Sequence, residues 1–438
     1  PGPPRPGAGL RSAAARLRGS RMAQNALWLY AVQAAVFVFP LVTIPFLARV
    51  LRPEGWGLVV FCQSFSAWLL LIVQYGFNFS ATREVARGRD DPERVAEIVA
   101  GVQGARVALL GVAAAIGAAA FLFVPELRRH PGYLAGAWIA AVATGFVPLW
   151  YFQGTERLRG PALLDIGIRL ASNLGIFFWV TESTGWRVLA LQAGGSLVSV
   201  AVTNAWMYRS VPFRLPRLAA ALATLRSGWP LFVFVSAASV YTVANSFLLG
   251  LLVGTGAVGF FGAADKIVRA GMSLFGPLSQ AMYPRINQLV ARDVAHADRV
   301  LRRTLVPFVG MGVAMGAGVA LLAPLIVRVL LGPQYGPAVT VLRILALLPP
   351  LIGFGTVVGI HWAIPLGLDR AYNRFVLTAG ALNLGLALLL VPRYGAAGMA
   401  SAAVLAETVV ESGLAWLYVR HLLRTRVRPL AVASEARA

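Results

Sequence analysis

Lysine is almost absent from this chain of 438 residues. Lys266 is the only lysine, so nearly all of the 39 basic residues are arginine. Acidic residues are also scarce, with 17 against those 39, which gives a formal net charge of +22. All charged residues together make up 13% of the chain and hydrophobic residues 58%, whereas a soluble globular domain is about a quarter charged. A water-soluble fold cannot bury that much apolar surface, so the composition predicts lipid as the solvent for much of the chain.

Cysteine and histidine are equally sparse. The single cysteine, Cys62, excludes a disulfide framework and a thiolate metal site. The four histidines lack metal-binding spacing, and no Walker A loop, G-x-S-x-G or dinucleotide fingerprint occurs. We therefore expect no metal and no cofactor, and no enzymatic activity. Nucleic acid is not an expected partner either, because the arginines lie in short clusters between apolar runs, as in the cytoplasmic loops of membrane proteins.

Twelve apolar runs are each long enough to cross a bilayer as a helix, which takes about 20 residues. They lie at 25–48, 57–79, 99–124, 133–152, 161–180, 187–208, 229–254, 257–281, 305–331, 341–365, 375–392 and 396–419. The predicted fold class is an all-α polytopic membrane protein of about twelve transmembrane helices in two lobes.

The arginines between these runs predict the orientation. If the N-terminus is cytoplasmic, 27 basic residues fall in inner segments and seven in outer ones. This bias favours both termini inside. The expected organisation is a disordered basic tail (1–22), an N-lobe of six helices (23–208), a cytoplasmic linker (209–228), a C-lobe of six helices (229–420) and a cytoplasmic tail (421–438). Met22 is a plausible translation start.

A corner sequence recurs at the outer end of four odd-numbered helices. The four stretches are VLRPEGWG (50–57), LLVGTGAVG (251–259), LLGPQYG (330–336) and LVPRYGAAG (390–398). Each turns on glycine or proline, as a tight corner requires. The first two occupy corresponding places in the two halves, which favours two parallel six-helix repeats, a pattern typical of transporters. The alternative is that such turns occur at any helix exit.

Ionisable residues inside the apolar runs point to a binding site. Asp265 and Arg269 are spaced i, i+4 with the acid first, which favours an ion pair, and Asp165 and Arg169 repeat that spacing. If both pairs form, Lys266 is left unpaired about 13 Å along its helix. An unpaired charge at mid-bilayer costs about 2.5–3.5 kcal/mol on insertion scales, so we expect Lys266 to face a hydrated cavity between the halves.

Two further arginines, Arg106 and Arg343, are expected to join that cavity. A cavity lined by cations attracts an anion, and arginine and lysine both suit phosphate. The predicted ligand is therefore a phosphorylated substrate held by Lys266, Arg269 and Asp265, with Arg106, Arg169 and Arg343 nearby. The alternative is that the charges neutralise one another and hold helices together.

Two carboxylates, Glu407 and Glu411, lie i, i+4 on one face of the last predicted span. Carboxylates that close tend to share a proton, so the pair is a candidate for coupling transport to H+ or Na+, with Asp165 as a further candidate. The alternative is that each pairs with a basic residue of another helix. Polar residues such as Gln74, Asn78 and Asn173 are interpreted mainly as interhelical hydrogen-bond partners, some of them lining the cavity.

Five stretches carry a resemblance to a known family: NALWLYAVQAAVFVFPLVTIPFLARVLRPEGWG (25–57), YGFNFSATREVARGRDD (75–91), PLWYFQGTERLRG (148–160), VGFFGAADKIVRAGMSLFGPLSQAMYPRINQL (258–289) and VPRYGAAGMASAAVLAETVV (391–410). They resemble bacterial O-antigen and polysaccharide flippases of the multidrug/oligosaccharidyl-lipid/polysaccharide exporter superfamily. The overall resemblance extends from Asn25 to about Arg420. The near-absence of lysine departs from the family and makes Lys266, inside the fourth stretch, stand out.

The resemblance implies a two-lobed bundle that alternates its opening. It implies a flippase that moves oligosaccharide units linked to polyprenyl pyrophosphate across the bacterial inner membrane, coupled to an ion gradient. Within the matching motif it points to Lys266, Asp265 and Arg269 as binding residues. Expected partners are this lipid-linked glycan, membrane lipid, and a polysaccharide polymerase with its chain-length regulator.

Three other functions compete with this interpretation. A drug or cation antiporter of the same superfamily would need a net acidic cavity, whereas this one is predicted to be basic. A membrane polysaccharide polymerase or ligase usually carries a large outer loop, whereas the predicted outer segments are short. A scaffold without transport activity would not explain the charges inside the spans.

Overall fold

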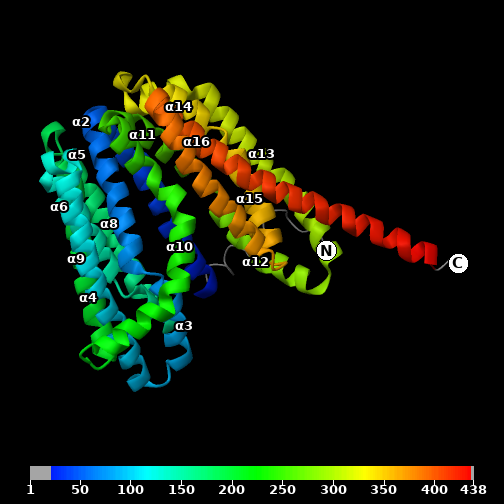
Figure 1. Cartoon of the computed structure of the whole chain (residues 1–438), viewed down its shortest axis with the longest axis horizontal. Coiled ribbons are helices and arrows are strands. Elements are labelled where there is room, and N and C mark those ends of the chain that lie inside the picture. The colour runs from blue at the N-terminus through cyan, green and yellow to red at the C-terminus, as the bar shows by residue number, and fades with distance from the viewer. Residues whose placement is uncertain (1–20, 436–438) are drawn as a thin grey trace, which may run out of the picture.

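The computed structural model describes residues 21–435, and side chains within 42–423 except at 234, 235, 237, 238, 240–242, 281, 284, 291, 294 and 295. Residues 1–20 of the expected basic tail therefore lie outside the described residues. Within them the chain forms helices and no strand (Figure 1). The first part comprises α2 (Arg21–Gln74), α3 (Phe77–Gly88), α4 (Pro92–Phe123), α5 (Pro125–Arg129), α6 (Pro131–Phe146), α7 (Leu149–Gly154), α8 (Arg159–Trp179), η1 (Glu182–Thr184) and α9 (Trp186–Ser210). The second comprises α10 (Leu218–Val253), α11 (Thr255–Met272), α12 (Phe275–Arg292), α13 (Val294–Ile326), η2 (Val327–Leu331), η3 (Pro333–Tyr335), α14 (Ala338–Leu345), α15 (Leu348–Gly355), η4 (Thr356–Ala363) and α16 (Asp369–Glu435).

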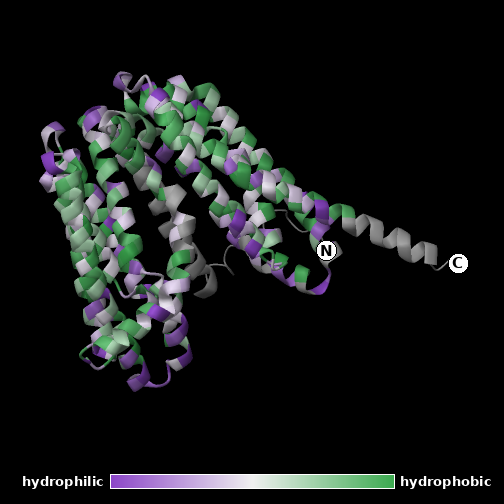
Figure 2. Ribbon diagram, viewed as in Figure 1, coloured by the Kyte–Doolittle hydropathy of each residue, from purple (hydrophilic) through white to green (hydrophobic). Residues whose placement is uncertain are grey.

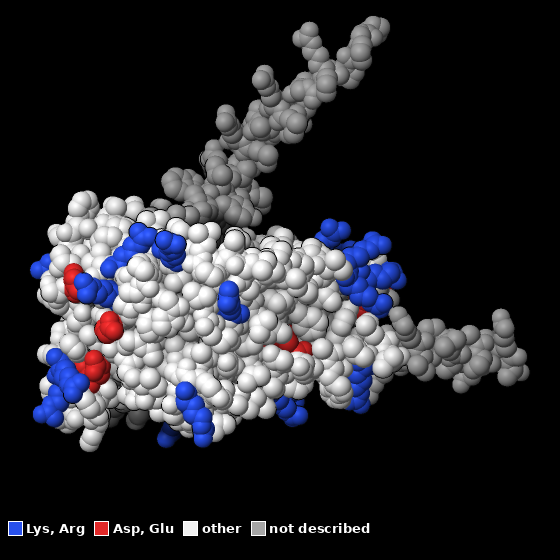
Figure 3. Space-filling view, turned by 90° about the horizontal axis from the view of Figure 1, so that it is seen from above, with Lys and Arg blue, Asp and Glu red and all other residues white. Residues whose placement is uncertain are grey.

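Eight helical stretches in the described residues are long and apolar enough to cross a membrane. They are Val42–Gly88, Pro92–Phe123, Pro131–Gly154, Arg159–Trp179, Trp186–Ser210, His296–Leu331, Ala338–Ala363 and Asp369–Leu423. Hydrophobic residues cover the lengths of the helices, and hydrophilic ones gather at their turns (Figure 2). Seen from above, basic side chains lie mainly towards the two ends of the long axis, with a largely uncharged surface between them (Figure 3). The all-α membrane fold class is confirmed at this level.

Several helix limits differ from the predicted runs for local reasons. The run expected at 57–79 is interrupted after Gln74, where Tyr75 and Gly76 both have positive φ. The run at 133–152 breaks at Val147–Pro148, because proline has no N–H to continue the helix. The run at 257–281 ends its first helix at Met272. Helix α10 begins at Leu218, so the second half of the expected linker 209–228 is helical.

All four predicted corners contain one residue with a positive φ. Arg52 (φ 58°, ψ 175°), Gly254 (φ 105°, ψ 173°) and Gly332 (φ 101°, ψ 168°) share nearly the same conformation, and Gly395 has φ 54°. This region of backbone conformation is essentially restricted to glycine, so Arg52 is strained. The corners at Arg52 and Gly395 divide α2 and α16 into two helical segments each.

The first two corners bring α2 and α11 into backbone contact. A Cβ on Gly57 would overlap the Thr255 carbonyl, and one on Gly259 would overlap the Pro53 carbonyl. Gly57 and Gly259 each lie five residues after the positive-φ residue of their corner. The two helices can therefore cross this closely only because both positions are glycine.

Three apolar clusters define how the halves meet. The largest contains residues of both halves near the four corners, including Leu51, Val258, Leu331 and Ala396. The second contains only residues from the first half and the start of α10, and the third only residues from Met272 onward. The halves therefore share one core at the corner end and have separate cores at the other end, where they diverge in Figure 1.

Substitution of Gly57 by alanine tests the crossing. We expect Gly57→Ala to lower the stability of the detergent-purified protein by about 2–3 kcal/mol, because the new methyl group collides with backbone that cannot move aside. The matched control is Gly111→Ala on α4, where a Cβ meets no atom within 4 Å. Thermal unfolding midpoints measure both variants, and equal midpoints would contradict the close crossing.

Candidate functional site

Lys266 extends from α11 towards α2, directly below the glycine crossing. Its Nζ donates a hydrogen bond to Oε1 of Gln63 at 2.8 Å and lies 4.6 Å from the ring centroid of Trp56. Both partners belong to α2 and are neutral. The ammonium is thus held by an amide and an aromatic face, which orient the positive charge without cancelling it.

The neighbouring ion pair forms as predicted. Nε of Arg269 lies 2.7 Å from Oδ2 and 2.8 Å from Oδ1 of Asp265, one helical turn away. The Asp265 side chain is 17% exposed and that of Arg269 is 45% exposed. Much of the Arg269 side chain is therefore accessible beside this ion pair.

A pocket of about 450 Å³ connects the two halves at this level. We call it the central pocket. Residues of α2, α8 and α9 from the first half and of α11 and its C-terminal end from the second half line it. Its polar or aromatic lining side chains are Thr43, Trp56, Gln63, Asn173, Gln192, Lys266, Arg269 and Ser273. The structure therefore places both Lys266 and Arg269 in a cavity between the halves.

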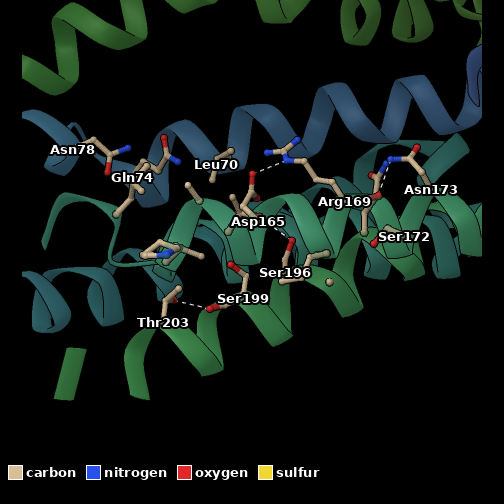
Figure 4. Close-up of a pocket in the computed structure, with 18 of the residues that line it drawn as sticks. Leu70, Gln74, Asn78, Asp165, Arg169, Ser172, Asn173, Ser196, Ser199 and Thr203 are labelled. Carbon is tan, nitrogen blue, oxygen red and sulfur yellow. Dashed lines mark hydrogen bonds and ion pairs between the residues drawn. The ribbon is translucent and has the colours of Figure 1, made fainter. Parts of the chain in front are cut away.

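A second pocket, of about 790 Å³, lies within the first half between α2, α8 and α9 (Figure 4). We call it the polar pocket. Its polar lining residues are Gln74, Asn78, Thr144, Asp165, Arg169, Ser172, Asn173, Gln192, Ser196, Ser199 and Thr203. Asn173, Ile176 and Gln192 line both pockets, so the two are adjacent compartments.

The predicted pair of Asp165 and Arg169 lies in the polar pocket. Nε of Arg169 is 2.7 Å from Oδ2 of Asp165, and the two side chains are 59% and 51% exposed. Arg169 is thus paired as expected, but it lines the compartment beside the one that holds Lys266.

Arg106 does not line the central pocket, which corrects the expectation that it joins Lys266. Its side chain is fully buried, with the guanidinium about 6 Å from the ring centroids of Phe77, Phe146 and Trp150. Nη2 donates to the Val147 carbonyl at 3.4 Å. That carbonyl lies at the C-terminal end of α6, where the partial negative charge of the helix favours a cation.

Arg343 is also separate from both pockets. It lies on α14, is exposed, and directs its Nε to the Ala320 carbonyl at 3.4 Å. The expectation that it joins the cavity near Lys266 is therefore wrong for this structure, because α14 holds it near α13 at the corner end.

Glu407 and Glu411 share one buried face of α16, as their spacing predicted, and are 8% and 6% exposed. Glu411 packs against the backbone of Gly355 in α15, and Glu407 lies within electrostatic range of Arg269. The two carboxylates lie in the second half and do not line the central pocket.

Sequence reasoning missed Trp56, Gln63 and Gln192. Neutral residues carry no signal comparable to a charge in an apolar run. Trp56 lies in a corner stretch, which is the one feature that marked its position. Gln63 and Gln192 are hydrogen-bonded to each other, Nε2 to Oε1 at 3.3 Å, across α2 and α9. Only the three-dimensional arrangement reveals that they connect Lys266 to the polar pocket.

Comparison with known proteins assigns the chain to a family. Residues 22–290 match the family described as "Polysaccharide biosynthesis protein". The chain belongs to this family. A relative named "Putative O-antigen transporter" from Escherichia coli (strain K12) is 29% identical over 405 residues, which cover 91% of this chain and 96% of that protein. One of the same name from Shigella dysenteriae is 28% identical over 397 residues, covering 89% and 98%.

Solved structures show the fold of this polysaccharide biosynthesis protein. The structure titled "Lipid II flippase MurJ, inward closed conformation" superposes with a TM-score of 0.71 at 12% identity, covering 89% of this chain and 87% of that one. "Crystal structure of MATE in complex with MaD3S" gives 0.51 at 17% identity, covering 89% and 95%. The relatives bear the names of transporters rather than enzymes. With its apolar helices, the family member is a multi-pass protein of the bacterial inner membrane.

Cysteine accessibility tests the pocket independently of function. The native Cys62 is fully buried, so it gives little background labelling. We expect Lys266→Cys to react with a small water-soluble thiol reagent at least about tenfold faster than Ala264→Cys, which is buried on the same helix. Arg106→Cys is also expected to react slowly. Equal rates at all three positions would show that Lys266 does not line an accessible cavity.

Proposed function

We propose that this protein is a flippase that moves oligosaccharide units linked to polyprenyl pyrophosphate from the cytoplasmic to the outer leaflet of the inner membrane. Its membership of a polysaccharide biosynthesis family, relatives named as O-antigen transporters and a transporter fold support this function. The process served is assembly of O-antigen, capsule or exopolysaccharide.

The observation that carries the proposal is that Lys266 contacts the neutral side chains of Gln63 and Trp56 in a pocket shared by both halves. A diphosphate offers several anionic oxygens, which are far better acceptors for an ammonium than the amide of Gln63. On binding, the diphosphate replaces Gln63 as the partner of Lys266. Arg269, tethered to Asp265 but partly exposed, supplies a second cation from one turn away.

The arrangement of the cores supports alternating access. The halves share one apolar cluster at the corner end and have separate clusters at the other end. With the orientation that places 27 basic residues inside and seven outside, the corner end is the outer one. The proposed state is therefore closed to the outside, with the diphosphate site approached from the cytoplasm.

We propose the finer topology on the same basis: twelve spans, both termini inside, an N-lobe of 23–208 and a C-lobe of 229–420. The corners within α2 and α16 allow each to cross twice. Helices α10 and α11 supply the two remaining crossings, and α10 is long enough to span after its first turns pack on α4.

A gradient of H+ or Na+ is proposed as the energy source for transport, with Glu407 and Glu411 as the residues that couple to the ion. Glu407 lies within range of Arg269, so binding of an anion at Arg269 changes the field at the carboxylate. Coupling through Asp165, and association with a polymerase and chain-length regulator, stay predictions from the sequence. The antiporter and polymerase alternatives are not favoured, because the central pocket is basic and the corners are short.

Labelling from one side of the membrane tests the topology. We expect Ser183→Cys, in the exposed turn at η1, to react with a membrane-impermeant thiol reagent added to spheroplasts. Phe213→Cys, exposed in the turn before α10, is expected to react only after lysis. The reverse pattern would overturn the orientation.

Complementation tests the function. In a strain lacking its O-antigen flippase and supplied with this protein's own glycan pathway, the wild-type gene is expected to restore surface polysaccharide. Lys266→Ala is expected to lower it roughly 10- to 100-fold, the loss typical of one charge-assisted hydrogen bond. Lys266→Arg should retain part of the activity, because it keeps the charge.

Arg343→Ala is the matched control, since it removes a cation that lines neither pocket. Failure of the wild type to restore polysaccharide while the protein is present in the membrane would contradict the proposed function. Equal activity of wild type and Lys266→Ala would contradict the site.

A further inference from the structure

The polar pocket has a composition that the diphosphate does not explain. More than half of its lining residues are polar, yet its only charged side chains, Asp165 and Arg169, neutralise each other at 2.7 Å. The remaining polar groups are amides and hydroxyls. Such a surface suits neither a bare anion nor a hydrocarbon tail, whereas it matches a ligand rich in hydroxyl groups.

Part of this polar surface has no structural partner. In the described part of the chain, the side chains of Gln74, Asn78 and Ser199 make no hydrogen bond to protein, although all three line the pocket. By contrast, Thr144 and Ser196 join α6 to α9 through a 2.9 Å contact of their hydroxyls. The first three side chains therefore do not serve as links between helices, and in Figure 4 they lie along the walls of the cavity.

The polar pocket begins where the central pocket ends. Gln192 and Asn173 line both, and Gln192 is connected to Lys266 through Gln63 by hydrogen bonds of 3.3 and 2.8 Å. From Gln192 the pocket continues along α9 to Thr203, about 16 Å farther at 1.5 Å per residue. In a lipid-linked glycan the first sugar is bonded to the diphosphate, so a sugar site must adjoin the diphosphate site in this way.

We propose that the polar pocket is the saccharide subsite of this transporter, resting on the proposed function. Gln192 and Asn173 contact the sugar next to the diphosphate, and Gln74, Asn78 and Ser199 contact sugars farther along the chain. The first half thereby binds the glycan, and α11 of the second half binds the phosphates. Around a ligand without hydroxyl groups, the amides of the pocket stay without hydrogen-bond partners, which weakens binding. The subsite therefore discriminates in favour of hydroxyl-bearing ligands.

Binding to the purified protein in detergent tests the subsite. The probes are bare farnesyl diphosphate and farnesyl diphosphate that carries one glucose, galactose or N-acetylglucosamine. We expect the wild type to bind bare diphosphate and to bind at least one sugar-bearing probe about tenfold more tightly. In Gln192→Leu, the sugar-bearing probe should bind no more tightly than bare farnesyl diphosphate does to the same variant, whereas Lys266→Ala should weaken every probe.

The matched control is Gln334→Leu, the same substitution at an exposed glutamine of η3 that lines neither pocket, which should bind all probes as the wild type does. The subsite is overturned if no sugar-bearing probe binds more tightly than bare farnesyl diphosphate. It is also overturned if the gain in affinity persists in Gln192→Leu. Either result leaves the flippase function intact. Absence of binding by every probe to folded wild type contradicts the proposed function itself.

Discussion

The close crossing of α2 and α11 at Gly57 and Gly259 is the constraint on which the rest of the structure depends. Two helices from different halves approach until backbone meets backbone, which no side chain larger than hydrogen would permit. This contact lies within the apolar cluster that the halves share. It fixes how far apart the halves are one and two turns farther along, where the central pocket lies.

The placement of Lys266 follows from that crossing. Trp56 precedes Gly57 and Gln63 lies on the same helix, so α2 presents an aromatic face and an amide to the ammonium. Neutral groups stabilise a cation in the membrane only in part, and a ligand of opposite charge supplies the remaining electrostatic stabilisation. Asp265 forms its ion pair with Arg269. The Lys266 ammonium can therefore form an ion pair with an anionic ligand.

The sequence predicted those parts of the protein for which charge or apolar length gives a signal. The all-helical membrane class, the four corners and the two i, i+4 ion pairs followed from such signals. The same reasoning failed for Arg106 and Arg343, because an arginine in an apolar run can instead contact aromatic rings or a backbone carbonyl of a neighbouring helix. Sequence spacing does not distinguish these surroundings from a cavity. Gln63 and Gln192 were missed because they connect elements distant in the chain, which only the packing of α2 against α9 brings together.

A structure determined experimentally with farnesyl diphosphate bound would test the central claim most directly. We expect the phosphate groups within hydrogen-bonding distance of Lys266 Nζ and close to Arg269, with Gln63 displaced from the ammonium. Phosphate density elsewhere, with Lys266 still bound to Gln63 and stacked on Trp56, would contradict the claim that this lysine holds the diphosphate between the two halves.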